Sequence, residues 1–274
     1  MGRYHYYRLH PFSLAEALGI GNKIKPGEEL AFQGRKDGAE AFSDLFLYGG
    51  FPEPFLKKNL RTLRRFHNER QERLIKEDIR DVESVRDLSA LQILAQILPE
   101  KVGSLLSLNS LREDLGVAHK TISLWIDILE RFYYHYRVYP YSASAIKSLR
   151  KEPKLYLWDW SQVETPANRF ENMIAGHLLK LVHWLHDTEG YKVELKYLRD
   201  IEGREADFLV LYEGKPWFAV EVKLSDETVS KSLKYFKEKL EIPFAYQVVK
   251  TGGIDFLQNG YRVISADKFL GGLF

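Results

Sequence analysis

The sequence contains no cysteine in its 274 residues. This absence excludes a disulfide scaffold and a thiolate metal site, and it is typical of a protein of the reducing cytoplasm. Apolar runs are short and interrupted by charges, so no segment predicts a membrane-spanning helix. The first residues, MGRYHYYRLHPF, have no signal-peptide core. We therefore expect a soluble cytoplasmic protein with no membrane partner.

Two motifs of common enzyme classes are also missing. The stretch GVAHKT, residues 116–121, ends like a Walker loop but lacks the first glycine and the preceding strand, so no ATP site is expected. The eight histidines form no H-E-x-x-H pattern. His177, His183 and His186 share one predicted helix, but their spacings do not align all three on one face. A small-molecule enzyme built on histidines is therefore disfavoured.

The net charge is small, but positive charge is concentrated in two parts of the chain. The formal net charge is only +2. Residues 57–80 nevertheless carry nine Lys/Arg against four Asp/Glu, and residues 101–151 carry eight against four. A basic helix can be an ordinary solvated surface or a surface that faces phosphates, and the sequence leaves both interpretations open.

The chain divides into four regions. Residues 1–42 hold a short helix begun by Ser13 and a Gly/Pro-rich loop, with too few apolar repeats for a core, and are interpreted as an incomplete unit. Residues 43–84 predict a helical region. Residues 85–160 predict a helix stopped by Pro99, a second closed near Gly116 and a third, AHKTISLWIDILERFYYH, in helix-turn-helix order. Two alternating segments, YHYRVYPY and PKLYLWDW, then read as the strands of a wing.

A winged helix places the start of its third helix against nucleic acid. The corresponding candidates for nucleic-acid contact, with DNA the expected partner, are His119, Lys120 and Thr121, together with Lys147, Arg150 and Lys151 in the connection between the wing strands. The same fold also serves as a docking or purely structural module, and that alternative stays open.

The fourth region, residues 161–274, has the order αβββαβ. A helix is predicted over 168–186, strands near 192–198 and 206–212, a turn at 213–214, a strand over 218–224, a helix over 227–240 and strands near 244–250 and 261–264. This order predicts a mixed sheet flanked by helices. The whole chain is thus expected to be α+β or α/β: a helical region and a winged helix-turn-helix, followed by the mixed-sheet domain.

The strand FAVEVKL, residues 218–224, carries the candidate chemistry. Alternation puts Glu221 and Lys223 on one face. Asp207 begins the antiparallel neighbour across the short turn, and Glu171 lies on the helix before the sheet. One interpretation is an ordinary ion pair. The other is a Mg²⁺ or Mn²⁺ site with Asp207 and Glu221 as ligands, in which Lys223 orients water or stabilises a phosphate.

The pattern E…(E)AD…EVK on this strand order resembles the PD-(D/E)xK nuclease superfamily, which includes restriction endonucleases and archaeal Holliday junction resolvases. The resemblance implies that Asp207 is the first acid of the motif, Glu221 the second, Lys223 the lysine and Glu171 the helical acid. It implies a metal-dependent, phosphodiester-hydrolysing activity and a restriction-endonuclease-like fold for residues 161–274. Ala206 stands where the motif usually has proline.

The wider chain is similar to a prokaryotic ATPase family. The segments YYRLHPFSLAEAL, LYGGFPEPFL, RFENMIAGHLL and READFLVLYEGKPWFAVEVK occur in that family's order. Such proteins join an N-terminal AAA-type ATPase to a C-terminal domain of unknown function, with a winged helix and a nuclease-like fold. The resemblance implies an ATPase partner, and it implies that residues 1–42 are a remnant of, or linker from, an upstream ATPase module. The competing hypothesis is a non-enzymatic interaction or regulatory module on an inactive nuclease fold, and the sequence does not define an oligomeric state.

Overall fold

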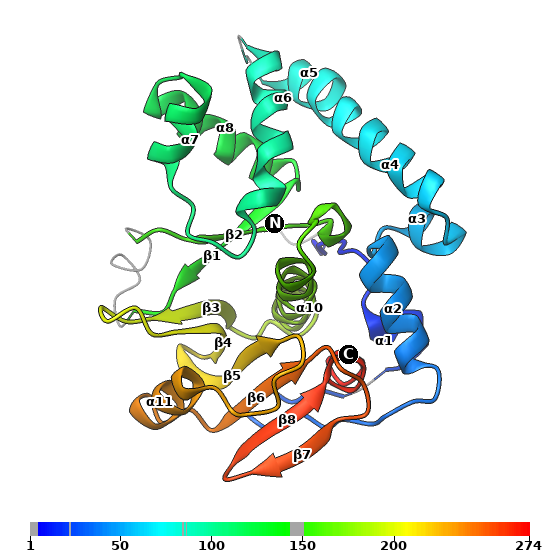
Figure 1. The fold of residues 1–274 in the computed structure, drawn as a ribbon, viewed down its shortest axis with the longest axis vertical. Helices are drawn as coiled ribbons and strands as arrows, with labels where there is room; N and C mark the ends of the chain where they lie inside the picture. The colour runs from blue at the N-terminus through cyan, green and yellow to red at the C-terminus, as the bar shows by residue number, and fades with distance from the viewer. Residues whose placement is uncertain (1–4, 22, 84, 86, 143–150) are drawn as a thin grey trace.

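One mixed sheet organises the molecule in the computed structural model, which describes residues 5–21, 23–83, 85, 87–142 and 151–274. Within these residues the sheet has eight strands in the order β2-β1-β3-β4-β5-β6-β8-β7 (Figure 1). Neighbours β5, β6 and β8 are parallel, whereas β3, β4 and β5 are antiparallel. The fold is therefore mixed α+β, as the sequence predicts. The strands are β1 His135–Pro140, β2 Lys154–Leu157, β3 Val193–Arg199, β4 Glu205–Tyr212, β5 Lys215–Lys223, β6 Phe244–Val249, β7 Asp255–Gln258 and β8 Tyr261–Ser265.

Some helices precede the first strand, and others lie between or after the strands and cover the two faces of the sheet. Those before the sheet are α1 Leu14–Ala17, α2 Gly38–Tyr48, α3 Pro52–Lys57, α4 Leu60–Arg73, η1 Leu74–Ile79 (a π-helix), α5 Arg80–Val82, α6 Leu88–Ile97, η2 Leu98–Lys101, α7 Leu108–Leu115 and α8 His119–Arg131. Those that follow are η3 Trp160–Gln162, α10 Pro166–Glu189, α11 Lys231–Lys239 and α12 Ala266–Gly271. Among the described residues, no helix is both long enough and apolar enough to cross a membrane. The sequence did not predict β7 or α12.

The two faces of the sheet have separate hydrophobic cores because side chains alternate along each strand. Phe208 and Val220 join the large core that contains α10, whereas Leu209 and Ala219 join a smaller one that contains α11. Helix α10 begins with Pro166 and ends at Gly190, whose φ of 75° suits glycine. We call these faces the α10 face and the α11 face.

Helices lie at the positions predicted for the helix-turn-helix, and two paired strands lie at those predicted for the wing, but the strand pair belongs to the main sheet. Helices α7 and α8 meet at Gly116, which has a left-handed φ of 65°. Strands β1 and β2 pair antiparallel, and β1 also pairs in parallel with β3 at Tyr139 and Pro140. The β1–β2 strand pair, which follows α6, α7 and α8, is consequently joined to the rest of the sheet by backbone pairing (Figure 1).

The described N-terminal residues pack on the α10 face. Leu14 and Leu30 are buried in its core. The backbone N–H of Leu14 donates to Nε2 of His177 at 3.0 Å, and Trp217 Nε1 donates to the carbonyl of Glu28 at 2.7 Å. This segment, which the sequence assigns to a linker, therefore contributes to the core that supports α10.

Candidate functional site

The β4–β5 hairpin sets the positions of the candidate acids. Glu213 and Gly214 have φ values of 48° and 76°, so they form a two-residue turn with both central residues in the left-handed region. The ladder pairs Tyr212 with Lys215 near the turn and Phe208 with Val220 at its far end. Asp207 and Glu221 follow one step beyond this last pair, where the two strands begin to separate.

A β-bulge redirects Asp207. The β3–β4 register shifts between Lys196 and Leu198, which leaves one additional residue in β4. As a result Ala206 and Leu209 both face α11, although strict alternation would put them on opposite faces. Asp207 lies within this irregularity, so its carboxylate does not follow the alternation of Leu209 and Leu211.

The carboxylate of Asp207 is held between two strands. Its Oδ2 accepts a hydrogen bond from the backbone N–H of Val222 at 2.8 Å, and its Oδ1 lies 3.9 Å from Lys154 Nζ. Burial and the charge of Glu171 raise the pKa of Asp207 to about 7. A carboxyl group with a raised pKa is stabilised by a bound proton or by a nearby cation.

Glu221 and Lys223 form the pair expected from alternation. Lys223 Nζ lies 2.8 Å from Glu221 Oε1. Glu221 is only 5% exposed, and its Oε2 accepts no hydrogen bond of ordinary geometry, although the Ser230 side chain lies close enough to lower the pKa of Glu221. Burial and the charge of Asp207 raise the pKa of Glu221 to about 7. Burial alone would lower the pKa of Lys223, but the hydrogen bond to Glu221 and the surrounding acids raise it, so Lys223 is charged.

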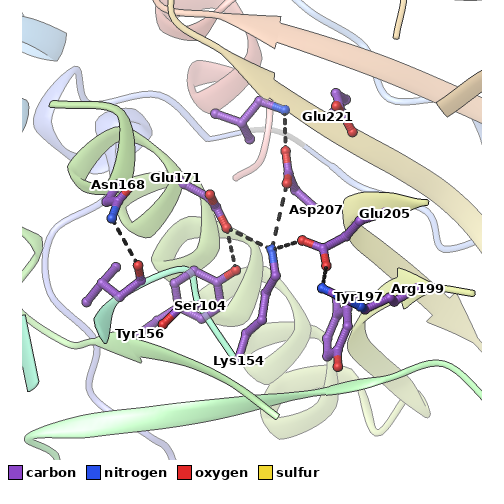
Figure 2. A network of polar contacts seen from close by, with 12 residues as sticks. Ser104, Lys154, Tyr156, Asn168, Glu171, Tyr197, Arg199, Glu205, Asp207 and Glu221 are labelled. Carbon is purple, nitrogen blue, oxygen red and sulfur yellow. Dashed lines mark hydrogen bonds and ion pairs between the residues drawn. The ribbon is translucent and has the colours of Figure 1, made fainter. Parts of the chain in front are cut away.

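Glu171 meets a different lysine from the one the sequence suggests. It reaches the cluster from α10, where Glu171 Oε1 accepts from Tyr156 Oη at 2.7 Å and from Lys154 Nζ at 3.2 Å (Figure 2). Lys154 also lies 2.6 Å from Glu205 Oε1. Burial would lower the pKa of Lys154, but the charges of Glu171, Asp207 and Glu205 raise it. The structure thus brings Glu171 to Asp207 through Lys154, and Lys223 to Glu221.

Backbone and amide contacts fix β2 against α10. Asn172, fully buried, accepts from the N–H of Leu157 at 2.9 Å and donates to its carbonyl at 2.7 Å. Gly103, with a φ of 75°, lies so close to Glu171 that an added Cβ would be 3.2 Å from Oε2. The loop before α7 therefore covers the Glu171 carboxylate, and this close approach favours glycine.

Sequence reasoning missed Lys154, Glu205 and Tyr156. The signal for Lys154 is its place in KLYL, a strand buried at every position, where a lysine requires an acidic partner. Glu205 stands two residues before Asp207, so alternation puts both carboxylates on one face, and the bulge turns that face toward the ammonium of Lys154.

The predicted nucleic-acid residues separate into two groups. His119 and Lys151 line one hollow of ≈ 300 Å³ beside Arg137 and Tyr139. Lys151 also lines a neighbouring hollow of ≈ 550 Å³ that contains Tyr197, Arg199 and Lys239. Lys120 and Thr121 instead border a third hollow, of ≈ 570 Å³. Lys147 and Arg150 lie outside the described residues.

The basic segment 57–80 is partly neutralised by its own surroundings. Ion pairs four residues apart join Lys57 to Glu53, Arg65 to Glu69 and Lys76 to Glu72, and a further pair joins Lys58 to Asp44 of α2. Such pairs reduce the positive potential available to a phosphate backbone. The exposed basic side chains of His119, Lys120 and Lys151 are accordingly the stronger candidates for nucleic-acid contact.

The carboxylates fit a hard divalent cation with few protein ligands. Within the described ranges, no group of three or more His, Asp or Glu side chains is arranged to hold a metal. A Mg²⁺ or Mn²⁺ ion that retains several waters needs only one or two carboxylates. The unpartnered Oε2 of Glu221 is the group that a cation there would satisfy.

Two family models match the chain in succession. Residues 39–168 match "Domain of unknown function (DUF8612)", and residues 168–269 match "Domain of unknown function (DUF4143)". No curated protein and no solved structure matches the chain. The two matches meet near the start of α10, so Lys154 belongs to the first matched segment and the acids belong to the second.

Proposed function

We propose that this protein binds nucleic acid, with DNA as the favoured partner, and hydrolyses phosphodiester bonds with Mg²⁺ or Mn²⁺. The observation that carries the proposal is the meeting of Asp207, Glu221 and Lys223 at the open end of the β4–β5 ladder. We further propose that the chain works with an AAA-type ATPase, on the resemblance described above.

The division of labour among these side chains follows from their contacts. Asp207 and Glu221 would hold the ion, which supplies an activated water and charge stabilisation when bound. Lys223 is charged and fixed by Glu221, so it is suited to hold a phosphate oxygen rather than to accept a proton. Glu171 and Lys154 keep Asp207 in position from the α10 face.

A cleavage assay tests this function. Linear, branched and single-stranded DNA and single-stranded RNA are incubated with the full chain and Mg²⁺ or Mn²⁺. We expect cleavage that chelation abolishes and that Lys223→Met reduces. Asp78→Asn, an exposed aspartate of η1, is the matched control and should cleave normally. Absence of metal-dependent cleavage on every substrate would contradict the nuclease proposal.

A second candidate function, a non-enzymatic docking module, is favoured by the hollow beside α8. Its lining includes Val85, Val117, Leu124 and Trp125 in addition to Lys120, so it is more apolar than a surface that contacts phosphates requires. Leu124 is 49% exposed. If Leu124→Asp leaves DNA binding unchanged but abolishes binding to a purified ATPase partner, α8 is a docking helix.

A further inference from the structure

Lys154 is buried among acids that belong to the candidate site. Its side chain is 3% exposed, and Nζ lies 2.6 Å from Glu205 Oε1, 3.2 Å from Glu171 Oε1 and 3.9 Å from Asp207 Oδ1 (Figure 2). The stem passes the ring of Tyr197, whose centroid is 5.8 Å from Nζ. One ammonium therefore faces three carboxylates that come from α10 and β4.

Such an arrangement resembles the shell of a metal ion more than a simple ion pair. Three carboxylate oxygens around one point repel one another unless a cation lies among them, and burial increases the cost of leaving them unpaired. The lysine supplies that cation permanently, without an ion from solution. The position beside Glu171, Glu205 and Asp207 is thus already filled by the protein.

The charge balance favours a single divalent ion. Four carboxylates, those of Glu171, Glu205, Asp207 and Glu221, face three cationic groups, those of Lys154, Lys223 and Arg199. When all these groups are ionised, one negative charge remains. One divalent ion reverses it to a single positive charge, whereas a second ion would add two further positive charges in a poorly hydrated site.

A second observation shows which acid of the cluster still lacks a partner. Glu221 is 5% exposed, and its Oε2 is buried without a partner, whereas its Oε1 contacts Lys223. On the Lys154 side, by contrast, Glu171, Glu205 and Asp207 all contact the ammonium. The Glu221 side of the cluster therefore still lacks a partner for one oxygen, whereas the acids on the Lys154 side already contact a cation.

We propose that Lys154 is a built-in cation that takes the place of a second divalent ion, so that the site binds one ion, at Asp207 and Glu221. Lys154 is a positioning residue, because it acts through Asp207 and Glu171. This inference rests on the proposed metal site. It also means that the segment matching the first family supplies a charge to a site whose acids lie in the second.

Counting bound Mn²⁺ by electron paramagnetic resonance tests the inference in the full chain. We expect one ion per chain in the wild-type protein. Lys154→Ala removes the ammonium and opens space beside Glu171, Glu205 and Asp207, so we expect two ions. The matched control is Lys196→Ala, which removes a lysine from an ion pair with Glu194 on β3, and should bind one.

Two results would overturn the inference. One is two ions in the wild-type protein, which would show that the lysine does not exclude the second. The other is a count in folded Lys154→Ala that stays at one. If Lys154→Ala does not fold, the double variant Lys154→Ala with Glu205→Gln is counted instead. It carries one uncompensated acid fewer, and a second ion is still expected at Glu171 and Asp207.

The ion count and the cleavage assay can fail independently of each other. Counts of one and two without any cleavage would support the role of Lys154 and remove the nuclease activity. Cleavage with an unchanged count of one would support the activity and remove the role of Lys154. No bound Mn²⁺ in any of the proteins would remove both.

Discussion

Asp207 accepts a hydrogen bond from the backbone N–H of Val222, the residue between Glu221 and Lys223, at 2.8 Å. The backbone ladder between β4 and β5 ends at Phe208 and Val220, and this side-chain contact continues the connection beyond it. A carboxylate that replaces a ladder contact is fixed by the backbone, not by the flexible ends of other side chains. Asp207 is therefore preorganised relative to Glu221 and Lys223.

Asp207→Asn should abolish metal-dependent cleavage and preserve the fold. The asparagine carbonyl can still accept from Val222, but the variant loses the charge that attracts a divalent ion. We expect cleavage to fall by at least about 100-fold, because loss of a neighbour of a metal ligand alone costs roughly 10- to 100-fold. Cleavage rates and circular dichroism are measured together. Full activity in the folded variant would exclude Asp207 as a ligand.

The contribution of Asp207 and Glu221 to the stability of the metal-free protein should fall as pH rises from about 4 to 8. Burial raises the pKa values of Asp207 and Glu221 to about 7, above their ordinary values of 3.8 and 4.5. At these two acids the folded state therefore binds more protons than the unfolded state, and their contribution is complete below the unfolded pKa values and is lost as pH rises through the folded ones. Buried histidines such as His135 and His177, whose pKa values burial lowers to about 3 and about 4, contribute in the opposite direction, so the effect of the acids is measured as a difference from a variant.

Thermal unfolding across this pH range provides the measurement. Relative to Asp207→Asn, which lacks one of the two groups, the wild-type protein should lose stability as pH rises from 4 to 8, whereas relative to Glu227→Gln, changed at an exposed position, it should not. Added Mn²⁺ should raise the unfolding temperature most above pH 7, where both acids are ionised. A wild-type stability that does not fall relative to that of Asp207→Asn over this range would contradict the raised pKa of Asp207.

Asn172 should be essential for joining the β1–β2 hairpin to α10. Its amide satisfies both backbone groups of Leu157 in a fully buried position. Asn172→Ala leaves a buried N–H and a buried C=O unpaired, at a cost of about 1–3 kcal/mol each. Denaturant unfolding measures the decrease in stability. Asn168→Ala, whose amide makes one hydrogen bond to Val102 at 3.2 Å, is the comparison and should cost less.

Local patterns predicted the elements of this fold better than the contacts of its site. Alternation put Glu221 and Lys223 together, and the two-residue turn at Glu213 and Gly214 put Asp207 on the adjoining strand. The bulge beside Asp207 arises from the register with β3, which no short stretch of sequence encodes. Lys154 reaches the acids only because β1 pairs with β3, a contact between residues far apart in the chain.

The same limit explains the N-terminal segment and the basic helices. Residues such as Leu14 and Leu30 are too few for a separate core, yet they are buried because α10 and the sheet supply the rest of it. The positive charge of residues 57–80 is visible in the sequence, but its neutralisation by Asp44 depends on how α2 packs against α3, whose C-terminal cap is Lys58. Net charge along a segment therefore overestimates its potential for phosphate.

Nucleic-acid binding should depend on the hollow shared by His119 and Lys151 more than on exposed lysines elsewhere. These residues, from α8 and from the start of the β2 segment, line one recess whose neighbour leads to Arg199, and Arg199 contacts Glu205 of the site.

The double variant His119→Ala/Lys151→Ala should weaken binding to duplex DNA at every sequence. It should also reduce the slope of log affinity against log salt by about 1 for each phosphate that the variant no longer neutralises. Fluorescence anisotropy at several salt concentrations measures both quantities, with Lys231→Ala/Lys234→Ala on α11 as the control. If the control weakens binding as much as the double variant, attraction is diffuse and this recess is not the path of the nucleic acid.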